Sequence, residues 1–154
     1  MSTRTKLIEV ALAEVGNQEN PMGSNLTKYG EWLKTTNHPK GWNGVAWCMI
    51  SMAYVYDKAG LSLGTPDYIE KLAWVPSALK IWQPVKTIDP KPGDLVIFNW
   101  DKKGEPEHVG MFAAWTIPQV SFLTFEGNIG NRFWPHHRTM EFVDGFFNPK
   151  ELPA

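Results

Sequence analysis

One stretch constrains this chain most: residues 44–56, GVAWCMISMAYVY, which carry the only cysteine of the protein. No Gly or Pro interrupts residues 46–59, so the sequence predicts a helix there, and Gly60 supplies a residue suited to ending it. Cys48 lies where a glycine-containing loop gives way to this helix. A thiol in the first turn faces the positive end of the helix dipole, which favours the thiolate. The alternative is that Cys48 is simply a small buried apolar residue.

Length and charge narrow the possible functions. A chain of 154 residues predicts one domain, spanning residues 1–154, and we expect it to be monomeric. The net charge is −1 with scattered Lys and Arg, which offers no surface suited to nucleic acid. One cysteine excludes an intrachain disulfide and a multi-cysteine zinc site, and nothing in the sequence calls for a cofactor.

Neither a membrane span nor an export signal is expected. The longest apolar stretch, residues 45–56, is too short to cross a bilayer. The first residues continue into an amphipathic run and not into the uninterrupted apolar core of a signal peptide. The sequence therefore predicts a protein synthesised in a cytoplasm without insertion into the membrane.

Helices are predicted in the first half of the chain and strands in the second. Apolar residues at spacings of three and four predict a helix over residues 3–15, ended by Gly16. Shorter helical pieces are predicted at residues 26–33, at residues 67–73, and from a capping Ser77 to Trp82. Strands are expected at residues 95–98, 108–115, 120–125 and 132–142, with a short last one near residues 144–146. Because these strands are close in sequence, the sheet should be antiparallel, with about four to six strands in an α+β fold.

His108 is the best candidate for a catalytic base. It opens a predicted strand after a polar loop, so we expect its imidazole at the sheet edge with one face toward solvent. Gly110 lies on the same side of that strand and leaves room for another group beside the histidine. The alternative is an ordinary surface histidine.

Two polar residues, Glu126 and Asn128, end the next strand on a common face. If the two strands form a hairpin, the start of the first lies beside the end of the second, which brings both residues next to His108. A carboxylate or carboxamide there can accept the Nδ1 hydrogen and stabilise the imidazolium. With Cys48, the three groups have the order of a nucleophile, a base and an orienting residue in thiol hydrolases. A polar hairpin end without catalytic function is the alternative.

Four motifs appear in a characteristic order. They are Trp47-Cys48 at a helix start, the segment KPGDLVIF at residues 91–98, His108-Val109-Gly110, and Glu126-Gly127-Asn128. In this order and spacing the chain resembles the CHAP family, the cysteine, histidine-dependent amidohydrolases/peptidases. The likeness extends to residues 25–30 and 144–146, and so covers most of the sequence.

The resemblance implies a papain-like fold and cleavage of bacterial peptidoglycan. The bond would join muramic acid to L-alanine or lie within the stem and cross-bridge peptides. Cys48 matches the family's nucleophile, His108 its base, Glu126 its orienting acid and Asn128 an assisting amide. A short chain without an export signal resembles a single-domain bacteriophage endolysin, an antimicrobial lysis enzyme that acts on the cell wall after release through a separate holin-like pore.

No metal site is expected. Some members of the family bind calcium through an aspartate-rich loop before the cysteine, and residues 17–47 contain no aspartate. Residues 99–104 resemble the start of a calcium loop, but Lys103 occupies a ligand position and Gly110 stands where a bidentate Glu is needed. His136 and His137 are adjacent on a predicted strand, so they point to opposite faces and cannot chelate one ion together.

Several aromatic residues near the proposed site are candidates for lining a substrate groove. They are Tyr29, Trp42, Trp47, Trp100 and Trp134. Packing in the core is the alternative for each. Two other functions also remain open: a non-catalytic module that binds the cell wall, and an interbacterial amidase toxin with the same chemistry.

Overall fold

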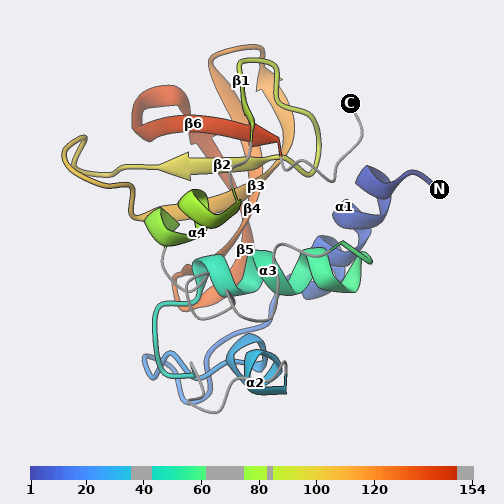
Figure 1. The fold of residues 1–154 in the computed structure, drawn as a ribbon, viewed down its shortest axis with the longest axis vertical. Coiled ribbons are helices and arrows are strands. Elements are labelled where there is room, and N and C mark those ends of the chain that lie inside the picture. Colours follow the sequence, from blue (N-terminus) through green and yellow to red (C-terminus); the bar gives the residue numbers. More distant parts are fainter. Residues whose placement is uncertain (36–42, 62–74, 83–84, 149–154) are drawn as a thin grey trace.

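In the described part of the chain the α-helices precede the strands, in agreement with the α+β prediction (Figure 1). The structure is a computed structural model that describes residues 1–35, 43–61, 75–82 and 85–148. The predicted helical piece at residues 67–73 lies outside the described residues. No helix in the described part of the chain has the length and apolar character needed to cross a membrane.

The described helices agree with the predicted ones to within a few residues, with one correction. They are α1 (Thr3–Glu14), α2 (Lys28–Thr35), α3 (Cys48–Lys58) and α4 (Val75–Trp82). Ser2 caps α1, since its hydroxyl accepts a hydrogen bond from the Thr5 N–H at 3.1 Å. Ser77 was expected to cap the last helix, but it lies inside α4, which begins two residues earlier. Pro76 there occupies an early helical position, where its missing N–H costs nothing.

The strands form one six-stranded antiparallel sheet in the order β1-β6-β2-β3-β4-β5. A hairpin joins β3 to β4, as predicted. The predicted fourth strand ends early, because a 3₁₀ turn at Met140–Phe142 separates β5 from β6. The strand bounds are β1 (Val85–Thr87), β2 (Leu95–Phe98), β3 (His108–Ile117), β4 (Ser121–Ile129), β5 (Arg132–Thr139) and β6 (Val143–Asn148).

The sheet buries apolar side chains on both faces. Leu95 and Ile97 of β2 belong to the large core shared with the helices. Val96 and Phe98, which alternate with them, belong to a second and mainly aromatic cluster on the other face. All four residues of β2 are buried, which explains its continuous apolar sequence.

The start of α3 is held tightly against the end of β4. A Cβ atom added to Gly127 would lie 2.3 Å from Ser51 Oγ and 2.8 Å from Trp47 Cζ3. Ser51 Oγ in turn donates to the Cys48 carbonyl at 2.8 Å, and Trp47 Nε1 donates to Glu19 at 2.9 Å. Close contact at this glycine therefore fixes the first turn of α3 beside the strand that carries Glu126.

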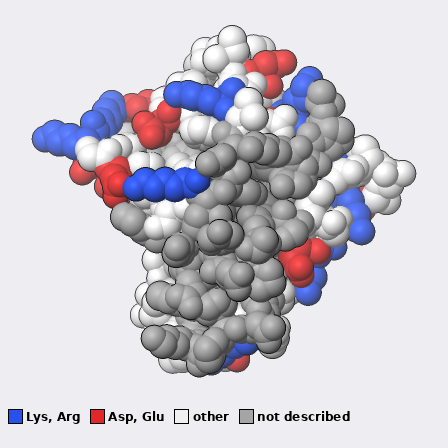
Figure 2. Space-filling model, in the orientation of Figure 1, with Lys and Arg blue, Asp and Glu red and all other residues white. Residues whose placement is uncertain are grey.

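Charged side chains of both signs are interspersed on the surface. On the face shown in Figure 2, Lys and Arg side chains of the described residues lie beside Asp and Glu side chains. This mixture agrees with the balance of 15 basic and 16 acidic residues in the sequence.

Candidate active site

Cys48 is the first residue of α3, so its thiol lies in the first turn of a helix as predicted. The side chain is buried, with 5% of the residue exposed. The first N–H groups of a helix have no intrahelical acceptor and carry partial positive charge. The Cys48 N–H is therefore available to an anion that forms beside the sulfur.

His108 and Glu126 meet at the end of the β3–β4 hairpin, which confirms the predicted juxtaposition. His108 Nε2 lies 2.7 Å from Glu126 Oε1, and both side chains are buried. The predicted contact through the Nδ1 hydrogen is wrong, because Nε2 makes it. With Nε2 held by Glu126, Nδ1 is the ring nitrogen left for Cys48, which is near enough to His108 to raise the pKa of the imidazole.

Gly110 allows this contact, as its place two residues after His108 predicted. A Cβ atom on Gly110 would lie 2.7 Å from Glu126 Cγ and 3.3 Å from the Phe125 carbonyl oxygen. The carboxylate thus reaches His108 by passing over a residue that has no side chain.

Two residues that the sequence did not predict, Arg138 and Thr124, also hold Glu126. Arg138 donates from Nε to Oε2 and from Nη2 to Oε1, both at 2.8 Å, and Thr124 Oγ1 donates to Oε2. A bidentate guanidinium fixes both the position and the plane of a carboxylate. The sequence contained one indication of the contact with Arg138, namely an arginine on the strand predicted to follow the strand that carries Glu126.

The electrostatics of the cluster favour a charged pair. Burial lowers the pKa of His108, but hydrogen bonds to Cys48 and Glu126 outweigh it and raise the pKa to about 9. Burial raises the pKa of Glu126, but hydrogen bonds from His108 and Arg138 outweigh it and lower the pKa to about 2. His108 is therefore held as an imidazolium and Glu126 as a carboxylate near neutral pH.

His108 does not present a face to solvent, contrary to expectation. It is 4% exposed, because Trp100 and Phe98 stack on its ring with centroids 5.6 and 5.8 Å away. The loop after β2 turns Trp100 back over the imidazole. Asn99 holds that loop by donating to the carbonyls of Lys103 and Gly104.

Asn128 lies in an irregular part of β4. The pairing with β5 shifts register between Glu126 and Ile129, and Asn128 has a φ of +65°. Strand alternation, which predicted a face shared with Glu126, does not extend through such a bulge. Asn128 and His108 form no hydrogen bond among the described residues, so an assisting role for Asn128 stays a prediction.

The candidate groove residues separate into two groups. Tyr29 and Trp47 are fully buried and stacked on each other at 5.4 Å, and their polar atoms donate to Glu14 and Glu19. Neither ring can touch a substrate in this conformation, so both residues serve packing. Trp42 lies outside the described residues.

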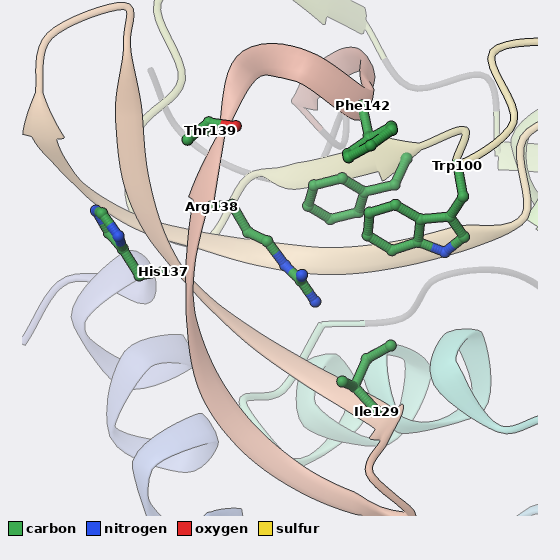
Figure 3. Close-up of a pocket in the computed structure, with 7 residues that line it drawn as sticks. Trp100, Ile129, His137, Arg138, Thr139 and Phe142 are labelled. Carbon is green, nitrogen blue, oxygen red and sulfur yellow. The ribbon is translucent and has the colours of Figure 1, made fainter.

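Trp100 and Trp134 remain accessible. Trp134 is 36% exposed, and the Arg132 guanidinium lies 4.2 Å from its ring centroid. Trp100 is half-buried and lines an open cavity of about 430 Å³ beside His108 (Figure 3). The other lining residues are Phe98, Ile129, His137, Arg138, Thr139 and Phe142.

The residues considered for metal binding are dispersed. The described part of the chain has no group of three His, Cys, Asp or Glu side chains placed to hold an ion. Asp101 instead accepts a hydrogen bond from the Lys103 N–H at 2.7 Å, and His137 Nε2 lies 2.9 Å from Thr116 Oγ1.

Replacing Gly110 with alanine should lower activity by about 10- to 100-fold, because the added methyl group displaces Glu126 from His108. Overpacking at this site should also lower the free energy of unfolding by about 1–3 kcal/mol. Urea unfolding and hydrolysis rates measured on the same preparation would check both values. Full activity in Gly110→Ala would show that the close approach of Glu126 is not needed.

The buried pair also predicts how stability depends on pH. The raised pKa of His108 contributes stability that is fully present below pH 6.5 and is lost as the pH rises through about 9. The lowered pKa of Glu126 contributes stability that is present above pH 4.5 and is lost as the pH falls through about 2. Urea unfolding from pH 2 to 10 should show both losses, and His108→Gln should flatten the alkaline one. An unchanged alkaline limb in that variant would contradict the assignment.

Comparison with known proteins bears on the fold. The structure resembles the crystal structure of the NlpC/p60 domain of the peptidoglycan hydrolase SagA, with a TM-score of 0.51 and 14% sequence identity. The likeness covers 94% of this chain and 97% of that chain. No protein-family model and no curated protein matches the sequence. The structural likeness thus confirms the predicted α+β, papain-like fold.

Proposed function

We propose that this protein is a cysteine-dependent hydrolase that cleaves an amide bond of peptidoglycan. The observation that supports this most is the buried cluster of Cys48, His108 and Glu126, in which His108 contacts Glu126 at 2.7 Å and Cys48 helps to raise the pKa of His108. A nucleophile, a base and an orienting carboxylate in this order suit acyl transfer. The choice of peptidoglycan draws on the CHAP-like motifs and on the hydrolase whose domain shares the fold.

In the proposed reaction, the Cys48 thiolate attacks the carbonyl carbon of the scissile amide. The oxyanion that forms accepts a hydrogen bond from the Cys48 N–H at the start of α3. The His108 imidazolium then protonates the leaving amine, and a thioester forms on Cys48. Water, deprotonated by the now neutral His108, hydrolyses the thioester to a carboxylic acid and regenerates the thiolate–imidazolium pair.

Glu126 and Arg138 act on the base and not on the substrate bond. Glu126 keeps the His108 ring oriented with one nitrogen toward the sulfur and stabilises its positive charge. Arg138 restricts the carboxylate to one plane through two hydrogen bonds of 2.8 Å. This support lets a buried imidazole keep its proton until the amine leaves.

The bond is that of an N-acetylmuramoyl-L-alanine amidase or of a stem or cross-bridge endopeptidase. Bacteriophage-induced lysis of the host, after release through a separate pore, is the biological role that we propose on the sequence resemblance. Expression in a bacterial cytoplasm with and without a co-expressed pore protein tests that role. Lysis only when the pore is present is the expected result, and intact cells with it would argue against the role.

Digestion of purified peptidoglycan tests the activity itself. Mass spectrometry should find soluble fragments with new free amino groups, and His108→Ala protein should release at least about 100-fold less. Fragments with new reducing sugar ends and no new amines would overturn the proposal. Binding to insoluble peptidoglycan without any release would instead support the wall-binding module.

A further inference from the structure

The cavity in Figure 3 adjoins the catalytic residues on two sides. Its wall residues Phe98 and Trp100 stack on the His108 ring, and its wall residue Arg138 binds Glu126. A group seated in this cavity is thus one side chain away from both members of the His–Glu pair. The cavity volume of about 430 Å³ fits one residue or acyl group of a substrate.

The charges at this cavity are already balanced within the protein. Arg138 donates hydrogen bonds from Nε and Nη2 to the two carboxylate oxygens of Glu126, which is fully buried. Next to the wall residue Phe142, Lys102 lies over the Phe142 ring and 3.6 Å from a Glu141 oxygen. A carboxylate in the cavity would come close to Glu126, and an ammonium group would find no free carboxylate among these residues.

The remaining walls are mainly apolar, with Thr139 and His137 as further polar lining residues beside Arg138. Ile129, Trp100 and Phe142 supply the apolar surface, and the Arg138 guanidinium points into the space between them (Figure 3). Its hydrogen bonds to described residues leave Nη1 unused. An N–H donor on an apolar wall suits a carbonyl or amide oxygen.

We infer that this cavity is a substrate subsite for an uncharged residue, aliphatic in its body and bearing a carbonyl or amide oxygen. The inference rests on the proposed function for its biological meaning. Burying a charged group without a partner costs far more than burying an amide that gains one hydrogen bond. The subsite therefore discriminates against acidic and free-amine groups next to the scissile bond.

A fragment titration tests the subsite without relying on catalysis. In NMR spectra of the full chain, the indole N–H resonance of Trp100, assigned with Trp100→Phe, reports on binding. The matched probes are N-acetyl-alaninamide (neutral), N-acetyl-alanine (anion) and alaninamide (cation). The neutral probe should shift the Trp100 resonance with at least about fivefold higher affinity than either charged probe. Equal or tighter binding of a charged probe, or no shift with any probe, would overturn the inference.

Kinetics on peptidoglycan fragments give a second measurement. Ile129→Asp puts a carboxylate into the wall and should raise KM by about fivefold or more, a larger factor than any change in kcat. Val120→Asp, at an exposed apolar residue between β3 and β4 that does not line the cavity, is the matched control for the added carboxylate and should behave like the wild type. An unchanged KM in Ile129→Asp would count against the subsite. If the wild type cleaves no peptidoglycan, the proposed function fails, and the fragment titration still decides the subsite.

Discussion

Cys48→Ala protein should fold normally and lose hydrolysis of peptidoglycan by a factor of about 10³ or more. The proposed reaction has no other nucleophile, since Cys48 is the only cysteine of the chain. The thiol is small, so its loss should change the free energy of unfolding by no more than about 1–2 kcal/mol. Amine release from purified peptidoglycan and urea unfolding of the same sample measure the two effects.

Cys48→Ser is the matched control for this variant. The hydroxyl keeps the size and polarity of the site but is a much weaker nucleophile than a thiolate, so activity should stay close to that of Cys48→Ala. Wild-type hydrolysis by either variant would exclude thiol catalysis. If Cys48→Ala is inactive because it does not fold, the activity of folded Cys48→Ser protein decides whether the thiol is required.

Changes at Glu126 should lower both activity and stability, and they should separate the orientation of His108 from the charge of its partner. Glu126→Gln should lower kcat by about 10- to 100-fold, less than Cys48→Ala, because it disturbs the His108 orientation and not the nucleophile. Glu126→Ala should also cost about 3–5 kcal/mol of stability, because Arg138 and His108 both lose a buried partner. Kinetics and urea unfolding of both variants check these values.

Glu105→Gln provides the control for removing a carboxylate. Glu105 is exposed in the loop before β3, so activity and stability should stay within error of the wild type. If Glu126→Gln behaves like Glu105→Gln, the Glu126–His108 contact has no catalytic importance.

The features that the sequence predicted correctly depend on local signals. Turn residues and apolar runs marked the hairpin of β3 and β4, and antiparallel pairing then placed His108 beside Glu126. Gly110 was informative for the same reason, because side chains alternate along a strand and a missing one leaves space at a known position.

The features that the sequence did not predict depend on long-range packing. Arg138 is paired with Phe122 in the register of β4 and β5, whereas Glu126 is paired with Trp134, so the register alone does not predict the contact between Arg138 and Glu126. Trp100 covers His108 because a nine-residue loop, residues 99–107, turns back on itself. Neither arrangement follows from spacing along the chain.

The burial of two aromatic residues, Tyr29 and Trp47, also depends on partners that are distant in sequence. Trp47 directly precedes Cys48, and Tyr29 lies in residues 25–30, which share the resemblance to the CHAP family. Both were therefore candidates for lining a substrate groove. Each is instead fully buried, because a buried carboxylate, Glu14 or Glu19, accepts its polar hydrogen. Such partners let polar aromatic residues enter a core, and they lie 15 and 28 positions away along the chain.

The central claim is that Cys48 carries the acyl group of cleaved peptidoglycan. Acid quenching during turnover of soluble peptidoglycan fragments, followed by proteolysis and mass spectrometry, measures this directly. The account predicts an adduct on the peptide that contains Cys48, with the mass of the acyl portion of a released fragment and absent from Cys48→Ala protein. Release of amine-bearing fragments at the wild-type rate by Cys48→Ala, or an acyl group on another residue, would contradict it.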